Sequence, residues 1–513
     1  MSLWIGAFNK SIADELQFKL SQRTAPIAAS DQQKIIFDWA QTSTGSLNII
    51  ARAGCGKTTT LLELARKVDT RAYASTFHSI GLRIWREMGH RSEIDGQKLK
   101  SLAKAVYPYD KKLSSLVASA VSFAKQTAFG VKGAPSGSEA DWAALIDYYQ
   151  LEDEITGGIS TERFISDCAK VFRRSMEMCT DKESVIDFDD MLLAPLYLYG
   201  NKPPSVQYDW VFCDESQDSN AVRRLIAKWI LKPGGRMVNC GDDRQAIYHF
   251  CGASSDAMNL IKEDLGAHEL PLNVTYRCPK AIVAMAQQWV PDFTAHDSAP
   301  EGTIRTIDHT DFWLERFEEN DSNVILCRNT RPLVGIAMRL REAGKACMVE
   351  GQSGQALITL ITKWGEITIA DFLVRMEEWR MGQENKWLSK SRPDKVEAVN
   401  DRCGSIKQLA QHMDEATDTT RRLVARVEML FGDDNRSDVL RLCTIHRSKG
   451  REWNKVFLVG RSTYQPSPYA STPEELQQEE NLMYVAITRV KKELVEVEVP
   501  RKGGKDSPEW WEV

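Results

Sequence analysis

The sequence predicts an α/β fold built on parallel sheets, and three observations support this prediction. An apolar run at 47–50 leads into the Gly-containing turn 51–58, and a helix-prone run at 59–67 follows the turn. Short apolar runs alternate with helical patterns in further parts of the chain. Strands that alternate with helices are typical of parallel, nucleotide-binding sheets. With 42% hydrophobic residues, the chain has enough apolar material for sizeable cores.

The turn between the first strand and helix has the residues of a phosphate-binding loop. It reads Ala53-Gly54-Cys55-Gly56-Lys57-Thr58, followed by Thr59. Backbone N–H groups at a helix N-terminus attract polyphosphate, and Lys57 adds a full positive charge. The Thr58 hydroxyl can hold a magnesium ion. Ala51 stands where the usual pattern opens with Gly, but both glycines that need backbone freedom are present.

The remaining elements are predicted in chain order. Leu3 to Phe8 reads as a buried strand, Asn9 to Leu20 as a helix, and Ser30 as the N-cap of another helix. Mostly helical patterns occupy 81–185 and 352–436. Further strands are predicted at 71–77, 208–213, 237–240, 302–307, 324–327, 439–443 and 455–459.

Composition excludes several classes. The 11 cysteines form no C-x-x-C pair, which argues against zinc and iron–sulfur sites and for a reducing compartment. No apolar run is long enough to span a bilayer, and the N-terminus lacks the layout of a secretory signal, so a cytoplasmic or nucleoplasmic protein is expected. The net charge of -5 means that any nucleic-acid binding must come from a local surface.

Four segments bear candidate chemistry. Asp214-Glu215 follows an apolar strand, where one carboxylate suits magnesium and the other can orient or deprotonate water; a solvated acidic loop is the alternative. Gln245 can sense a terminal phosphate, and the nearby Tyr248 and Phe250 either stack on bases or anchor a core. Arg277 and Arg489 are each weak evidence for a site when taken singly, since most arginines lie on the surface. An ATPase nevertheless needs such cations to neutralise the charge of its transition state.

Together these motifs resemble those of superfamily 1 DNA helicases of the UvrD/Rep/PcrA type, particularly small phage-like members. The matching segments are an adenine-reading Gln33, motif I at 53–58, Ib at 76–79, an Asp-Phe-Asp-Asp signature at 187–192, II at 214–218, III at 241–248, IV at 275–277, IVa at 326–330, V at 444–452 and VI at 484–489. They span nearly the whole chain.

The resemblance implies two RecA-like domains with ATP and Mg²⁺ in the cleft between them. The first covers 1–80 and 186–274 with an insertion at 81–185; the second covers 275–351 and 437–513 with an insertion at 352–436. Implied roles are phosphate and magnesium binding by Lys57 and Thr58, magnesium binding by Asp214, and water activation by Glu215. The implied γ-phosphate contacts are Gln245, Arg277 and Arg489; the adenosine contacts are Gln33, Tyr276 and Glu452; the DNA contacts are Phe8, Asn9, Thr76, His78, Tyr248, Phe250, Arg328, Thr444 and His446.

Three departures from the family pattern stand out. The segment 6–16 looks like motif Ia, yet it precedes motif I instead of following it, and we hypothesise a rearranged strand–helix unit that fills the same place in the sheet. Cys251 stands where the family often has Arg. The insertion at 352–436 looks shorter than the family's regulatory domain, and the segment after Arg489 leaves little room for a fused nuclease.

The expected activity is ATP-dependent translocation on single-stranded DNA, 3′ to 5′ by family inheritance, with unwinding at single-strand/duplex junctions. Loading, repair or replication proteins are possible partners. One alternative is a translocase that displaces proteins and barely unwinds duplex. Another is a nucleic-acid-binding module without catalysis, which the intact Lys57, Asp214, Glu215 and Arg489 argue against. RNA is a less favoured substrate.

Overall fold

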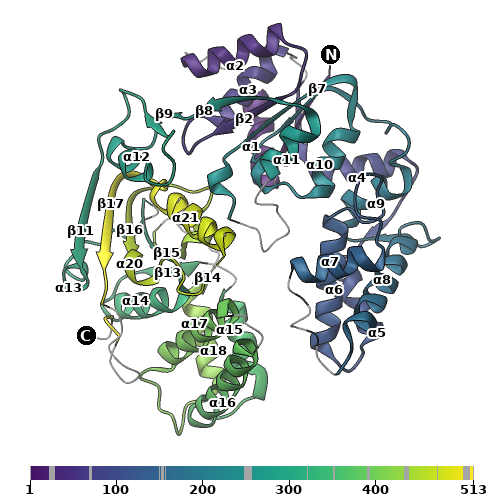
Figure 1. Ribbon diagram of the computed structural model, residues 1–513. Helices are drawn as coiled ribbons and strands as arrows, with labels where there is room; N and C mark the ends of the chain where they lie inside the picture. Colours follow the sequence, from purple (N-terminus) through teal and green to yellow (C-terminus); the bar gives the residue numbers. More distant parts are fainter. Residues whose placement is uncertain are drawn as a thin grey trace. The chain divides into compact units, whose positions relative to one another are not determined.

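The chain folds into two α/β units. The computed structural model describes residues 2–7, 9–21, 29–68, 72–149, 151, 155, 158–247, 257–320, 322–350, 353–389, 393–432, 438–470, 472–500 and 509–511. The units are Met1–Asn273 and Val274–Val513, and each is described by itself (Figure 1). Each contains a parallel sheet with helices, which confirms the predicted fold class.

The sheet of unit 1 has six strands. In spatial order they are β3 (Tyr73–Thr76), β1 (Leu3–Ala7), β6 (Tyr208–Cys213), β7 (Leu231–Gly241), β2 (Leu47–Ala51) and β8 (His268–Leu272). β1 runs parallel to both neighbours, with Ile5 opposite Ala74 on one side and Phe212 on the other. The N-terminal strand therefore lies inside the parallel sheet, as the hypothesis of a rearranged strand–helix unit requires.

The interior position of β1 follows from its composition. All five of its residues are buried, as expected for a strand covered on both faces. Trp4 is fully buried, donates from Nε1 to Ser75 Oγ at 2.9 Å, and meets the Phe77 ring edge-on at 5.2 Å. Burial of this apolar run, with the indole N–H of Trp4 paired, is consistent with an interior strand.

Five helices accompany this sheet: α1 (Lys10–Ser21), α2 (Asp31–Thr42), α3 (Lys57–Val68), α10 (Ala221–Trp229) and α11 (Ala257–Leu265). Ser30 caps α2 as predicted: its hydroxyl accepts from Gln33 N, and the Gln33 side chain accepts from Ser30 N. This reciprocal pair is a capping box, and it fixes the Gln33 side chain at the first turn of the helix.

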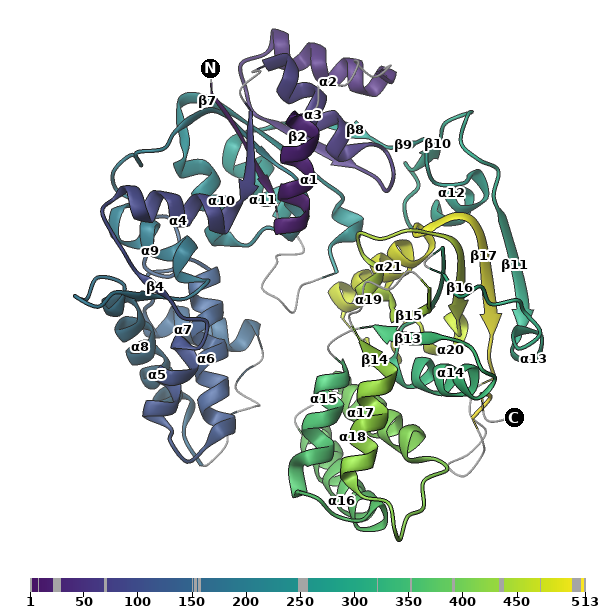
Figure 2. The same cartoon turned by 180° about the vertical axis from the view of Figure 1, so that it is seen from behind.

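The helical part of unit 1 lies in one group in both ribbon views (Figures 1 and 2). It contains α4 (Phe77–Glu87), α5 (Lys98–Val106), α6 (Lys111–Gln126), α7 (Glu139–Tyr148), α8 (Thr161–Met178) and α9 (Asp190–Tyr199), with the short parallel pair β4 (Glu93–Ile94) and β5 (Val185–Ile186). Its core is continuous with that of the sheet through Trp4 and Phe77.

Unit 2 has a seven-stranded parallel sheet. Its strands, in spatial order, are β11 (Thr303–Asp308), β17 (Val490–Glu498), β16 (Trp453–Val459), β12 (Asn323–Cys327), β15 (Leu440–Thr444), β13 (Cys347–Glu350) and β14 (Phe431–Gly432). A separate parallel pair, β9 (Val274–Thr275) and β10 (Thr294–Ala295), opens the unit.

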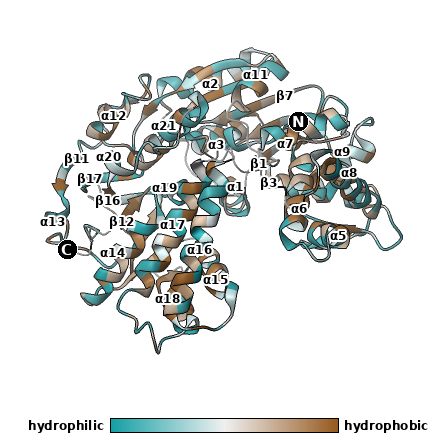
Figure 3. Cartoon of the chain, turned by 60° about the horizontal axis from the view of Figure 1, so that its bottom comes forward, coloured by the Kyte–Doolittle hydropathy of each residue, from teal (hydrophilic) through white to brown (hydrophobic). Residues whose placement is uncertain are grey.

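The helices of unit 2 include a group of four, α15 to α18, that packs together (Figure 2). The bounds are α12 (Lys280–Ala286), α13 (His309–Phe312), α14 (Thr330–Glu342), α15 (Ser353–Ile361), α16 (Ile369–Leu388), α17 (Pro393–Ala410), α18 (Thr420–Leu430), α19 (Ile445–Ser448), α20 (Arg461–Tyr464) and α21 (Pro473–Ile487). Hydrophobic and hydrophilic stretches alternate along α17 and α18 (Figure 3), and the hydrophobic ones join one core with the sheet.

Some elements differ from the sequence prediction. β17 and β13 were not predicted; the Lys and Glu residues of β17 interrupt its apolar run. β7 begins at Leu231 instead of residue 237 and includes Pro233-Gly234-Gly235, which reads as a turn in the sequence. Its pairing with β6 shifts register between Tyr208 and Trp210. Among the described residues no helix is long and apolar enough to cross a membrane.

Candidate active site

The phosphate-type loop follows β2 as predicted. β2 ends at Ala51, and α3 begins at Lys57. Gly54 and Gly56 have φ angles of 69° and 84°, which side chains disfavour, so glycine permits the tight turn. The first N–H groups of α3 lie at the loop, where a helix terminus attracts anions.

Two carboxylates face this loop. Asp214 and Glu215 follow the last residue of β6, and Glu215 adopts a left-handed φ of 50°, rare for a side chain of this size. The Thr58 hydroxyl donates to Asp214 Oδ2 at 2.9 Å. Lys57 Nζ donates to Glu215 Oε2 at 3.1 Å. The structure thus brings together four residues that the sequence predicted to cooperate.

A hydrogen-bonded chain extends this group to the loop after β7. Gln217 Nε2 donates to Glu215 Oε2 at 2.6 Å, and its Oε1 accepts from Asp242 N at 3.1 Å. Gln245 Nε2 donates to Asp242 Oδ2 at 2.8 Å. Arg52 Nη1 reaches Asp242 Oδ1 at 3.3 Å. Sequence reasoning placed Gln245 here but missed Arg52, Gln217 and Asp242 as site residues.

The charged side chains of this group shift one another's pKa values. Burial and the neighbouring Glu215 raise the pKa of Asp214 to about 6, although Lys57 and Thr58 act in the opposite direction. Burial also raises the pKa of Asp242, against Lys57 and Arg52. Burial opposes the charge on Lys57, but Glu215, Asp242 and Asp214 outweigh it and hold the Lys57 pKa above its usual range. A bound cation would stabilise the ionised Asp214 carboxylate, and a bound polyphosphate would stabilise the charged form of Lys57.

The donor set at the loop fits magnesium. The Thr58 hydroxyl and an Asp214 carboxylate oxygen are 2.9 Å apart, and both are hard oxygen ligands. Mg²⁺ is usually held by one or two protein oxygens together with substrate phosphates and water. The described residues contain no cluster of three or more His, Cys, Asp or Glu suited to a metal. The candidate magnesium ligands are therefore argued from the contact between Thr58 and Asp214.

Gln33 lies beside the loop. A Cβ at Gly56 would lie 3.6 Å from Gln33 Nε2, and that amide donates to Thr60 Oγ1 at 2.9 Å. Gln33 is 7% exposed and is held by Ser30 and Thr60. Its position beside the phosphate loop is compatible with the adenine contact that the resemblance implies.

The two predicted arginines of unit 2 have different partners. Arg277, which follows β9, forms an ion pair with Glu452, and Lys491 lies 3.6 Å from the same carboxylate. Arg489 is 3% exposed and donates to the carbonyls of Val485 at 2.8 Å and Arg451 at 3.2 Å. Burial and Arg277 lower the pKa of Arg489.

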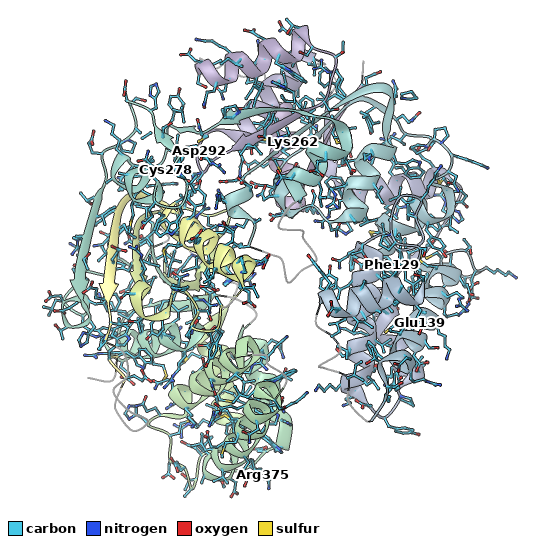
Figure 4. All side chains as sticks on the ribbon, viewed as in Figure 1. Phe129, Glu139, Lys262, Cys278, Asp292 and Arg375 are labelled. Carbon is cyan, nitrogen blue, oxygen red and sulfur yellow. The ribbon has the colours of Figure 1, made fainter. Side chains whose placement is uncertain are left out.

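Two expected adenosine contacts in unit 2 have partners within that unit. Glu452, expected to bind ribose, pairs with Arg277. The Tyr276 ring is 43% exposed and stacks on His296 with ring centroids 4.2 Å apart. Figure 4 labels Cys278, two residues beyond this tyrosine. One face of the Tyr276 ring is therefore occupied.

In unit 1 the described DNA candidates lie at the carboxyl edge of neighbouring strands. Ala7 of β1 is opposite Thr76 of β3, and Asn9 follows β1. Asn9 Oδ1 accepts from Ile12 N at 2.9 Å, and Thr76 Oγ1 accepts from Ser79 N at 3.0 Å, so each caps a helix. Burial and Arg223 lower the pKa of His78 to about 4, so its imidazole is neutral at pH 7.

The unit 2 candidates share the same kind of edge. Cys327, the last residue of β12, is opposite Thr444, the last residue of β15, so Arg328 directly follows the strand end that lies beside Thr444. Arg328 is bound by Glu479 at 2.6 Å and Glu397 at 3.0 Å, which offsets its charge. Burial and Arg328 lower the pKa of His446 to about 4. The predictions for Phe8, Tyr248, Phe250 and Cys251 concern residues that lie outside the described part of the chain.

Two parallel sheets, with a phosphate loop facing paired carboxylates in one of them, define the phosphate-loop nucleotide-binding class. Two family models match the chain: the UvrD/REP helicase N-terminal domain at residues 65–266 and the UvrD-like helicase C-terminal domain at 303–497. The chain belongs to the UvrD/Rep/PcrA-like superfamily 1 helicases. The first match begins inside α3, so the phosphate loop and β1 precede it.

Curated relatives agree with this assignment. The chain is similar to a probable DNA helicase II homolog of Mycoplasma capricolum, with 22% identity over 61% of this chain and 59% of that protein. It is 25% identical to the ATP-dependent DNA helicase Rep of Salmonella typhimurium over 44% of this chain and 32% of Rep. It is 24% identical to the ATP-dependent DNA helicase PcrA of Leuconostoc citreum over 51% and 34%. The chain thus spans less than two thirds of each of these relatives.

Proposed function

We propose that this protein is an ATP-driven DNA helicase or translocase that moves on single-stranded DNA and opens duplex at junctions. The observation that carries the proposal is the pairing of Lys57 with Glu215 and of Thr58 with Asp214 at the phosphate loop. Family membership supports the coupling of this chemistry to DNA. The polarity, 3′ to 5′, rests on the resemblance alone.

In the proposed reaction, the α3 N-terminus and Lys57 bind the phosphates of ATP. The β- and γ-phosphates compete with Glu215 for the Lys57 ammonium, which frees the Glu215 carboxylate to accept a proton from water. Thr58 and Asp214 would hold Mg²⁺, which when bound neutralises phosphate charge. Gln245, fixed by Asp242, is placed to sense the terminal phosphate.

For unit 2 we propose the roles that the resemblance implies. Arg277 and Arg489 supply positive charge to the γ-phosphate, Tyr276 and Glu452 contribute to adenosine binding, and Arg328, Thr444 and His446 contact the strand. The proposed role of Arg489 is supported by its burial and by the backbone carbonyls that hold its guanidinium in one orientation. A fixed guanidinium stabilises transition-state charge without reorganisation.

A protein-displacing translocase is the second candidate function. The described helices α15 to α18 of unit 2 form a small group at the position of the family's larger insertion, and this observation favours it. Unwinding of a forked duplex compared with displacement of a strand-bound protein separates the two functions. A catalytically silent module would hydrolyse no ATP at any DNA concentration.

The first test is ATP hydrolysis with and without single-stranded DNA. Glu215→Gln should keep nucleotide binding but lower hydrolysis by about 10²–10⁴-fold, since a general base contributes that much. Lys57→Ala should lose both. Matched controls are Glu263→Gln and the exposed Lys67→Ala, which should behave as wild type. Hydrolysis that persists in Glu215→Gln, or that ignores DNA, would contradict the proposal.

A further inference from the structure

A pocket of about 620 Å³ lies within unit 2, apart from the residues proposed to bind nucleotide. Its walls come from β11, the end of β17, α20 with the turn that follows it, one face of α21, and Trp289. The carboxyl ends of parallel strands are where α/β proteins commonly bind ligands. The position of this pocket therefore suits the binding of a ligand.

Gln465 is the unusual residue of this pocket. Its side chain lines the cavity and is 9% exposed. Among the described residues neither Gln465 Nε2 nor Gln465 Oε1 has a hydrogen-bond partner. Buried polar atoms are nearly always paired, so this amide offers one donor and one acceptor to a ligand. A planar donor–acceptor pair matches a peptide group.

The charges around the pocket select against phosphate. Four glutamates line it, against the single cation Arg461. Glu496 is paired with Arg461 at 2.6 Å, and Glu479 is paired with Arg328. Glu480 and Glu498 are exposed. This excess negative charge repels a nucleic-acid backbone and attracts a cationic group.

Apolar and aromatic side chains complete the surface. Leu476, Glu480 and Met483 recur at helical spacing and so share one face of α21. Leu476 is 44% exposed, unusual for leucine, and Met483 is a side chain that adapts to varied apolar partners. Apolar side chains therefore lie beside the carboxylates.

We propose that this pocket binds a peptide segment of a partner protein in which a basic residue stands beside an apolar one. Gln465 pairs with a peptide N–H and C=O of that segment. Glu480 and Glu498 receive the basic side chain, and Leu476 and Met483 receive the apolar one. The proposal goes beyond the ATP-driven activity, which uses none of these five residues.

The test is fluorescence polarisation of the full chain with labelled Ala-Leu-Arg-Leu-Arg-Ala, beside the same peptide with Glu for Arg. The Arg peptide should bind and the Glu peptide should not. Gln465→Leu should weaken binding about tenfold, since two hydrogen bonds are lost. Glu480→Gln with Glu498→Gln should weaken binding and reduce its sensitivity to salt.

The control is Gln288→Leu, an exposed glutamine one residue from Trp289 and outside the pocket lining, which should bind as wild type. Thermal melting and DNA-stimulated ATP hydrolysis should be unchanged in all variants, which separates this proposal from the proposed function. The proposal is overturned if the wild-type chain does not bind the Arg peptide. It is also overturned if the Gln465→Leu variant and the double glutamate variant both bind that peptide as tightly as wild type does. So does competition by single-stranded DNA, or self-association that Gln465→Leu abolishes, because a nucleic acid or a second copy would then be the occupant.

Discussion

Substitution of Lys98 by methionine should destabilise unit 1 severely. Lys98 and Lys125 are fully buried in the helical group. Lys98 Nζ contacts Asp190 Oδ2 at 2.7 Å, while Lys125 Nζ contacts Asp190 Oδ1 and Asp187 Oδ2, both at 2.6 Å. Two cations thus balance two carboxylates in an apolar core. Methionine fills the space of the lysine stem but removes one of the charges.

The magnitude follows from the uncompensated charge. Removing one member of a buried ion pair costs about 3–5 kcal/mol, because the remaining carboxylate is left without its counter-ion. For a unit of this size that free energy corresponds to a fall in melting temperature of roughly 6–20 °C. Lys98 also donates to Ser175 O at 2.7 Å, which adds to the loss.

Calorimetry or tryptophan fluorescence measures the melting of unit 1. Lys100→Met, exposed on the same helix, is the matched control and should melt within about 2 °C of wild type, as surface substitutions do. Adding Asp190→Asn to Lys98→Met restores charge balance and should recover part of the loss. Equal melting of Lys98→Met and Lys100→Met would refute the reasoning.

Three further outcomes are expected. Hydrogen bonds from Arg305 hold the pKa of Glu315 at about 2, so Glu315→Gln should destabilise unit 2 at pH 7. The difference in stability between variant and wild type should vanish as the pH falls from 4.5 towards 2, which thermal melting across that range measures. The pKa of His446 is about 4 in the folded state, so the unfolded chain binds this proton more readily and stability should decrease as the pH falls from 6.5 to 4. His446→Gln should reduce this dependence of melting temperature on pH in the same melts. Trp510→Ala should cost roughly 3–5 kcal/mol by denaturant unfolding, because the ring is 4% exposed; a loss below that of a surface substitution would contradict its place in the core.

The sequence predicted the residues whose signals are local. Lys57 and Thr58 follow a strand and open a helix, and Asp214 and Glu215 end another apolar strand, so adjacency in the chain suffices to predict their chemistry. Gln217 and Asp242 act through a hydrogen bond between segments 25 residues apart in sequence, and Arg52 through one spanning 190 residues. Gln217 and Asp242 lie within the matched segments 214–218 and 241–248, but no local pattern shows that residues so far apart in sequence contact each other.

The segment 509–511 was equally beyond sequence reasoning. Trp511 Nε1 donates to Gln408 Oε1 at 3.0 Å, and a Cβ at Gly335 would lie 2.3 Å from that indole nitrogen. Glycine is required there by a contact from far along the chain, and nothing around Gly335 indicates this. Long-range packing thus explains both a buried tail and a glycine within α14.

The place of β1 shows that neighbours in the sheet, and not order in the chain, position a strand. α3 leads directly from β2 to the edge strand β3, and α1 is tied to both sides of that connection: Arg66 Nη2 donates to Lys19 O at 2.8 Å, and Ala74 N donates to Gln17 Oε1 at 2.9 Å. β1 pairs with β3 through residues 4–7 and with β6 through residues 3–6. Adjacent parallel strands end at the same edge of a sheet, so Asn9 and Thr76 share that edge. They do so although β1 precedes the phosphate loop in the sequence and β3 follows it. The register of the sheet therefore brings together two residues that we propose contact DNA, although chain order alone would not predict that they are neighbours.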